Sequence, residues 1–181
     1  AVGNFGGELL VRAFLRDLHP GIVFRRRQGH HLDIVLLEGG DHLVVDDEAA
    51  FRTLAIRDLA WTAAFSTDEE TTSAAQWLVW EAGQALGAQS ASIQGLYDAR
   101  ATGEISGFTV PAINIRAQTF DMARTIFETA AAADVGAVIL ELARSEQTYT
   151  FQRPIDYATA VLAGAIAAGW RGPAFLPGDH Y

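Results

Sequence analysis

The sequence AVILEL at positions 137–142 is the clearest structural signal in this chain. Five of its six residues are apolar, which is typical of a strand buried on both faces of a parallel sheet. Apolar side chains at helical spacing precede it over residues 119–132 and follow it between Pro154 and Gly169. This order predicts a strand flanked by two helices.

Two further apolar runs extend the same pattern outward. One is FTVPAIN at positions 108–114, and the other covers residues 173–176. The three predicted strands begin at residues 108, 136 and 173, so their starts are 28 and 37 residues apart, the length of a βα unit. Three parallel strands cannot cover both of their faces alone. Either a doubly wound sheet or a (β/α)₈ barrel would complete them.

Residues 1–104 are predicted to form a mainly helical region with one β-hairpin. The hairpin is expected from the apolar runs at 34–37 and 43–45, which flank a Gly-Gly-Asp turn. Ser66 and Glu69 fit a capping box, in which each side chain would bond the backbone N–H of the other. The remaining elements expected in this region are helices over 8–19, 47–65, 67–86 and 90–101 and a short strand at 22–24. The helix over 67–86 would end at Gly87 and bury a stripe formed by Ala74, Leu78, Ala82 and Ala85.

The composition excludes several kinds of chemistry. The formal net charge is -9, from 22 acids and 13 bases, which argues against a nucleic-acid or anionic-membrane partner. The run Arg25-Arg26-Arg27 is too short to change this. The chain has no cysteine, so disulfides, thiolate nucleophiles and cysteine zinc sites are excluded. It also has no lysine, so it cannot form a Schiff base with a carbonyl substrate.

The location and the extent of the protein are inferred from absent patterns and from the chain ends. No apolar stretch reaches the roughly 18 residues of a membrane span, and the N-terminus lacks a secretion signal, so we expect a cytoplasmic protein. The sequence starts at Ala1 and stops after a predicted strand and the loop 177–181. We therefore expect that it is a fragment of a longer fold.

Polar residues stand where the predicted strands end. Asn114 follows the first strand, residues 141–145 surround the end of the second, and Asp179 and His180 follow the third. Ligands bind at this edge in both candidate architectures. A carboxylate beside an imidazole can supply an acid or base next to a metal ligand. Gly40-Asp41-His42 repeats the pair, and we interpret that copy as a hairpin turn.

These segments together resemble the opening of class II, metal-dependent fructose-bisphosphate and tagatose-bisphosphate aldolases. FTVPAIN at 108–114 is similar to the family's first strand, VILELARS at 138–145 to its second, and Asp179-His180 to the pair after its third. The likeness covers residues 105–181. It departs at Ala143, where a serine is usual in the family. The resemblance implies an α/β fold in which residues 105–181 form the first three βα units of a TIM (β/α)₈ barrel.

The resemblance also implies roles for individual residues. His180 would be a ligand of a Zn²⁺ cofactor, and Asp179 the catalytic proton donor and acceptor at the hydroxyl that becomes the aldehyde. Asn114 would bind substrate at the barrel mouth. Glu141 is left unassigned. Arg144 is interpreted as an exposed ion-pair residue rather than a phosphate clamp.

The expected function is zinc-dependent aldol cleavage and condensation of a ketose 1,6-bisphosphate in carbohydrate metabolism, giving dihydroxyacetone phosphate and an aldehyde. The substrate would be a phosphorylated sugar of the fructose or tagatose type, and we expect a homo-oligomer. The 181-residue chain alone is expected to be inactive, since its barrel is incomplete. Two alternatives are a non-catalytic barrel subunit of a tagatose-bisphosphate aldolase and a sugar-phosphate-binding or assembly protein.

Overall fold

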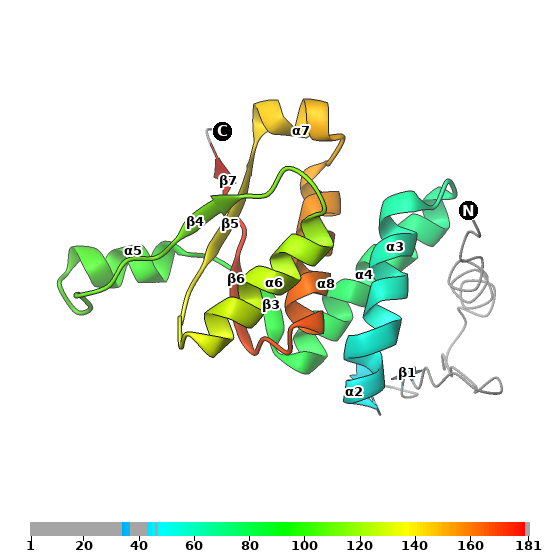
Figure 1. Ribbon diagram of the computed structural model, residues 1–181, viewed down its shortest axis with the longest axis horizontal. Coiled ribbons are helices and arrows are strands. Elements are labelled where there is room, and N and C mark those ends of the chain that lie inside the picture. The colour runs from blue at the N-terminus through cyan, green and yellow to red at the C-terminus, as the bar shows by residue number, and fades with distance from the viewer. Residues whose placement is uncertain (1–33, 37–42, 46, 180–181) are drawn as a thin grey trace.

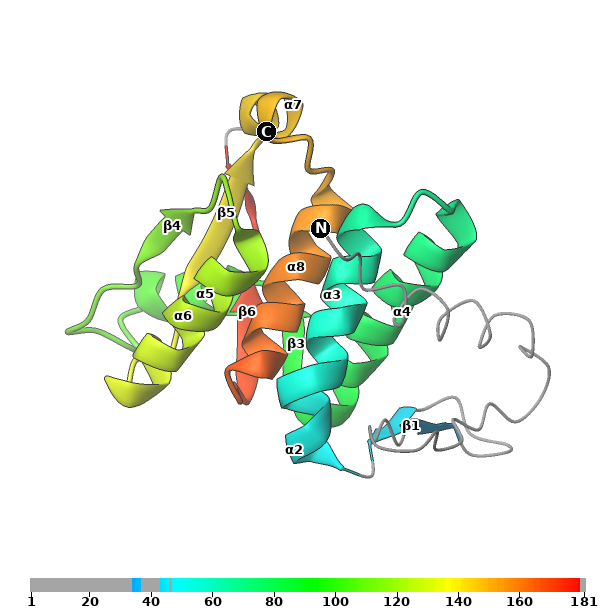
Figure 2. The same cartoon turned by 45° about the vertical axis from the view of Figure 1, so that its right-hand side comes forward.

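The computed structural model describes residues 34–36, 43–45 and 47–179. Its centre is a curled sheet of parallel strands, and most of the helices lie on one side of it, whereas the helix over Gln94–Ala101 lies apart from them (Figures 1 and 2). The strands run in the order β3-β6-β5-β4, and β7 pairs with the end of β5. Their bounds are β3 Ala88–Ala91, β4 Ala112–Asn114, β5 Ile139–Ala143, β6 Gly172–Phe175 and β7 Gly178–Asp179. The predicted α/β class is therefore confirmed.

The three predicted strands are present with shorter or shifted bounds. β4 keeps only the last three residues of the run 108–114, because it begins after Pro111, which has no N–H for a ladder. The carbonyl of Pro111 still accepts a hydrogen bond from Ile139 N at 2.9 Å, so the pairing with β5 starts there. β5 is buried at four of its five residues, as its apolar sequence indicates.

β3 is a strand that the sequence analysis did not predict. The helix expected over 90–101 is shorter, since residues 90 and 91 belong to β3 and the helix α5 covers Gln94–Ala101. The sequence AQSA of β3 has no strand pattern, and its pairing with β6 in register Ala88↔Gly172 determines its structure. The sheet thus takes strands from both sides of the boundary predicted at residues 104 and 105.

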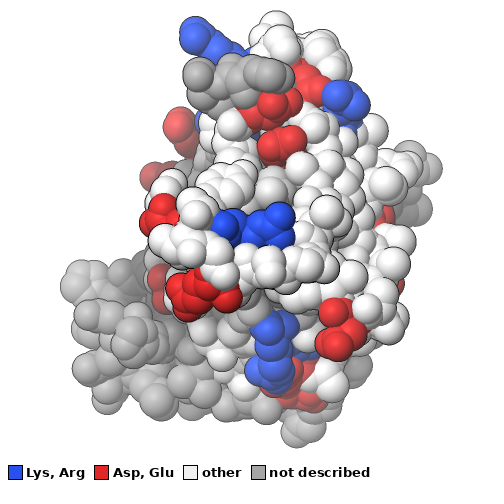
Figure 3. Space-filling model, turned by 90° about the vertical axis from the view of Figure 1, so that its left-hand side faces the viewer, with Lys and Arg blue, Asp and Glu red and all other residues white. Residues whose placement is uncertain are grey.

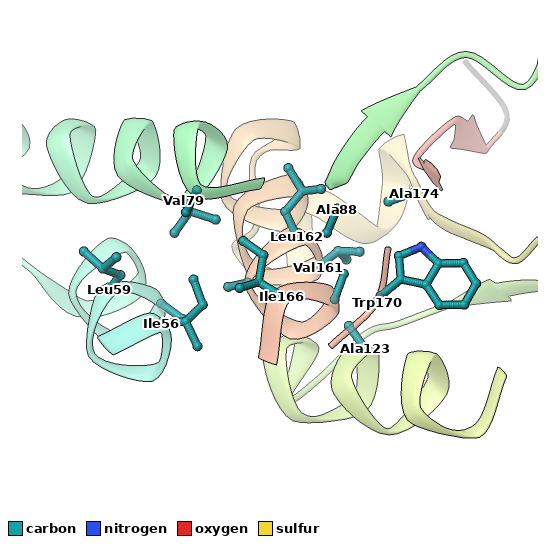
Figure 4. Close-up of a cluster of buried hydrophobic side chains, with 14 of the residues drawn as sticks. Ile56, Leu59, Val79, Ala88, Ala123, Val161, Leu162, Ile166, Trp170 and Ala174 are labelled. Carbon is teal, nitrogen blue, oxygen red and sulfur yellow. The ribbon is translucent and has the colours of Figure 1, made fainter. Parts of the chain in front are cut away.

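Helix α8, Pro154–Ala167, is the centre of the helix layer, and it packs against α3 (Ile56–Phe65), α4 (Glu69–Leu86) and α6 (Thr119–Ala132). Figure 4 shows its side chains Leu162 and Ile166 in the middle of the apolar cluster. Both are fully buried. Gly164 permits the close approach of α6, because a Cβ there would lie 2.8 Å from the carbonyl oxygen of Phe120. The predicted helix between Pro154 and Gly169 is confirmed.

The helices before the sheet follow the prediction except at one start. The short helix α2 (Glu48–Ala50), the π-helical turn η1 (Phe51–Ala55) and α3 occupy the predicted helix over 47–65. The expected capping box is wrong: α4 begins at Glu69, and its N-cap is Asp68, whose Oδ2 accepts from Thr71 N at 3.0 Å. Ser66 Oγ instead accepts from the Asp68 amide at 3.2 Å, outside the helix.

The far end of α4 agrees with the prediction more closely. The helix ends at Gly87, which is in the left-handed region with φ 78°. Ala74, Leu78 and Ala82 are buried as expected, whereas Ala85 is exposed and Leu86 takes its place in the core. The apolar stripe therefore turns slightly further round the helix than the sequence pattern suggested.

The predicted hairpin is also confirmed. β1 (Ile34–Leu36) and β2 (Leu43–Val45) pair antiparallel, with Ile34 opposite Val45. β2 packs against α4, and Val45 contacts the main apolar core. The helix expected over 8–19 and the strand at 22–24 lie outside the described residues. Among the residues that the structure describes, every helix is either too short or too polar for a membrane-spanning segment.

Candidate functional site

The polar residues of the sheet gather at the carboxyl ends of its strands, on the face away from the helices. Ile113, Leu140 and Leu142 pack into the core beneath α6 and α8. Side chains alternate along a strand, so Asn114 and its partner Glu141 lie on the opposite face. The short strand β7 brings Asp179 beside Ala143 at the same edge.

Asn114 is the link between two carboxylates. Its Nδ2 donates to Asp179 Oδ2 at 3.1 Å and to Glu146 Oε2 at 3.0 Å. An amide nitrogen carries two hydrogens, and ionised carboxylates only accept. Both hydrogens of Asn114 are therefore used within the protein, and its carbonyl oxygen Oδ1 is the part of the amide that can meet a ligand.

Glu146 anchors this arrangement from the first turn of α7, Arg144–Thr150, which follows β5 directly. Glu146 is 6% exposed and accepts hydrogen bonds from Ala143 N at 3.0 Å, from Asn114 and from Arg116 Nε. The hydrogen bond from the Ala143 amide, followed by those from Asn114 and Arg116, lowers the pKa of Glu146 although its burial opposes this. Glu146 is thus held as a buried anion.

Arg116 lies at the outer side of the network. Its Nε pairs with Glu146, and its side chain is 56% exposed, against 7% for Glu146. The pair with Glu146, and to a lesser extent a hydrogen bond with Tyr149, raises the pKa of Arg116. One edge of the guanidinium therefore faces the protein and the rest faces solvent.

A hollow of about 260 Å³ lies between α7, the start of α8 and the ends of β5 and β6, and none of the four network residues lines it. Its lining is mainly apolar and consists of Leu142, Gln147, Pro154, Tyr157, Ala158, Leu176, Pro177 and Gly178. Tyr157 donates its hydroxyl to the carbonyl of Glu141 at 3.0 Å, and burial raises the pKa of Tyr157. Gln147 Nε2 is buried, with no hydrogen-bond partner among the described residues.

The structure brings together two of the three residues singled out from the sequence. Asn114 and Asp179, 65 residues apart, are in hydrogen-bond contact. His180 lies outside the described residues. Arg144 is exposed at the start of α7, and Glu141 is half-buried on the same face as Asn114.

Sequence reasoning missed Glu146 and Arg116. Glu146 occupies the third position of a helix that starts right after a buried strand, where an acid often bonds the amide that precedes the helix. The residue at the cap itself, Ala143, cannot return the bond, so only half of a capping box is present and its usual signature is absent. The spacing of an acid three residues after a strand end was the available signal.

The described residues do not form a metal site by themselves. Within them there is no group of three or more His, Cys, Asp or Glu side chains that could hold a metal ion. A catalytic zinc takes three protein ligands. Glu146 already accepts hydrogen bonds from Arg116, Asn114 and the Ala143 amide. Asp179 is the carboxylate of the network that stands next to the expected ligand His180 in the sequence.

No family model, no curated protein and no solved structure matches this chain.

Proposed function

We propose that the protein is a zinc-dependent aldolase that acts on ketose 1,6-bisphosphates of the fructose or tagatose type. The observation that carries the proposal is the hydrogen bond between Asn114 and Asp179. The ends of the predicted strands and the family resemblance both assign these two residues to one site. They come from different strands and meet at the edge where parallel α/β folds bind ligands.

The order of the strands supports a (β/α)₈ barrel as the full architecture. β4, β5 and β6 are neighbours in chain order and are all parallel, with α6 and α8 between them on the outer face. In a closed barrel the free edge of the third strand pairs with a fourth. Here that edge of β6 pairs with β3, so the barrel proposal requires a later strand to replace β3.

Asp179 is the proposed acid–base residue. As a base it takes the proton from the substrate hydroxyl next to the bond that breaks, and that hydroxyl carbon becomes the aldehyde. The electron pair of the broken carbon–carbon bond remains on the ketone fragment as an enediolate, which is then protonated. Asn114 holds the Asp179 carboxylate in place through Oδ2 and offers its own Oδ1 to a substrate hydroxyl.

The proposed zinc would polarise the ketone and stabilise the enediolate. Of the residues in this sequence, His180 is the proposed ligand. The described residues do not complete a zinc site, and His180 is the one ligand that the proposal names.

The proposal is tested by cleavage assays on fructose and tagatose 1,6-bisphosphate with the protein as its gene encodes it. Asp179→Asn keeps the shape of the side chain and its bond from Asn114, but it is expected to lower kcat by about 10²–10⁴-fold. His180→Ala should lose bound zinc, measured by metal analysis. Arg144→Gln, at an exposed position of the same edge, is the matched control and should retain activity.

Three results would contradict the proposal. Cleavage that is undiminished in Asp179→Asn would remove Asp179 from the reaction. Unchanged zinc content in His180→Ala would remove the ligand assignment. If the unaltered protein shows no cleavage with either sugar, the function is not aldol chemistry, and a non-catalytic sugar-phosphate role becomes the better account.

A further inference from the structure

Arg116 has the geometry of an anion-binding residue rather than of an ordinary surface ion pair. It lies two residues beyond Asn114, at the carboxyl edge of β4. Its partner Glu146 is buried, whereas more than half of the Arg116 side chain is exposed. A surface pair with both ends in water is free to change partner. Here the buried end, Glu146, is held by two further donors, Asn114 Nδ2 and the Ala143 amide, so the direction of the guanidinium is fixed with it.

The donors of Arg116 are only partly used. A guanidinium has five N–H groups in a planar fork. The one on Nε goes to Glu146, and Tyr149 provides a further hydrogen bond. Within the described residues Glu146 is the one acid that forms an ion pair with Arg116. The outer edge of the fork therefore retains donors suited to two oxygens of one phosphate group.

We propose that Arg116 binds a phosphate group of the substrate, with Glu146 as the positioning residue that holds its guanidinium at the mouth of the site. This rests on the proposed function, which makes the substrate a phosphorylated sugar. The assignment deepens that proposal, because it names the cation that receives one phosphate.

Because the protein as a whole is negatively charged, a bound phosphate needs a nearby cation that is held in a fixed direction. The chain has a net charge of -9, so a phosphate is repelled by the protein as a whole. On the face shown in Figure 3, basic side chains lie in small separate groups among acids. Affinity for an anion must then come from directed hydrogen bonds. Because Glu146 pairs with Arg116, the two side chains together carry no net charge, and the attraction must come from the guanidinium N–H groups that point away from Glu146.

Phosphate binding can be measured without catalysis. Inorganic phosphate is titrated into the full protein in the presence of a chelator, and the Nε–H signals of the arginines are followed by ¹⁵N NMR. One signal should shift as phosphate is added until binding saturates. That signal should be absent in Arg116→Lys, which assigns it to Arg116. Arg116→Gln should raise the Kd for phosphate at least about tenfold, the equivalent of losing one charge-assisted contact.

Three variants separate the effect of positioning from the effect of charge. Arg144→Gln removes an equally exposed arginine from the same edge, and it should change the Kd by less than about twofold, as expected of a screened distant charge. Glu146→Gln keeps Arg116 but releases its anchor, and it should weaken binding by an intermediate factor. Arg116→Lys keeps the charge beside Glu146, and it should also weaken binding since lysine lacks the fork.

The outcomes distinguish failure of this proposal from failure of the proposed function on which it rests. Absence of saturable phosphate binding, or equal weakening by Arg116→Gln and Arg144→Gln, would overturn the role of Arg116. Neither result touches the acid–base role of Asp179, which is read from cleavage. Conversely, phosphate binding that depends on Arg116 in a protein without aldolase activity would uphold the site and reject the proposed reaction.

Discussion

The helix layer and the carboxyl edge of the sheet are built from opposite kinds of residues. In the layer, α8 is surrounded by α3, α4 and α6 and contributes an almost continuous run of buried apolar side chains. At the edge, Asn114, Glu146, Asp179 and Arg116 are joined by hydrogen bonds and one ion pair. Stability should reside mainly in the first region. Ligand binding should depend on the second, and each can be altered while the other is monitored.

The largest effect is expected from truncating the centre of the helix layer. Leu162 is 1% exposed and lies in the middle of the apolar cluster (Figure 4). Leu162→Ala removes its contacts and leaves a cavity, which should lower the free energy of unfolding by about 2–5 kcal/mol. Urea denaturation measures this. A loss below about 1 kcal/mol would mean that the layer is loosely packed and that the contrast drawn here is false.

The next effect concerns the amide that joins the two carboxylates. Asn114→Asp has the same shape, but it replaces two donors by an acceptor and places a third carboxylate between Glu146 and Asp179. We expect a loss of about 2–3 kcal/mol at pH 7, the range for hydrogen bonds to charged groups. Asn114→Ala, which removes the donors without adding charge, should cost less. An equal cost for both variants would show that repulsion plays no part.

The edge should also make stability depend on pH. The pKa of Glu146 is lower in the folded protein than its ordinary value of 4.5. Its contribution is therefore complete above about pH 4.5 and is lost as the pH falls through the folded-state pKa. Thermal melts between pH 3 and 7 should show a smaller acid-induced drop in Glu146→Gln than in the unaltered protein.

Asp156 provides the comparison for this measurement. Its burial raises the pKa, but hydrogen bonds from Arg153 and Gln76 outweigh this and lower it overall. Asp156→Asn should also flatten the acid limb of the stability profile, independently of Glu146, because the two residues share no partner. If neither variant changes the profile, acid unfolding must arise from other carboxylates.

The sequence predicted the apolar parts of this molecule better than the polar ones. The strand around Leu140 and the helix between Pro154 and Gly169 follow from hydrophobic pattern and from end signals that act locally. The strand β3 does not, because its four residues carry no pattern and depend on pairing with β6. The position of β3 instead accounts for the glycine at position 83, because a Cβ on Gly83 would lie 2.5 Å from the carbonyl oxygen of Ala88.

The sequence predicted those residues of the site that lie at the ends of predicted strands. Asn114 and Asp179 were both placed at the correct edge, because parallel strands align their carboxyl ends. Glu146 and Arg116 were not, since their pairing depends on how the chain turns after β4 and β5. Such a turn has no periodicity. An acid three residues after a strand end was a local signal for Glu146, but its pairing with Arg116 has no signal in the sequence.

The smallest effect tests a local signal that the sequence placed wrongly. Asp68 caps α4 by accepting from Thr71 N at 3.0 Å and from the Thr71 hydroxyl, while the side chain of Ser66 bonds the backbone of Asp68. Asp68→Ala should therefore cost about 1 kcal/mol, as is usual for loss of an N-cap. Ser66→Ala should cost less, although Ser66 was the cap predicted from the sequence. Urea denaturation of the two variants decides the matter, because a greater loss in Ser66→Ala would mean that the helix begins two residues earlier in solution. That result would return the N-terminus of α4 to the capping box of Ser66 and Glu69, whereas the expected result keeps it at the cap formed by Asp68.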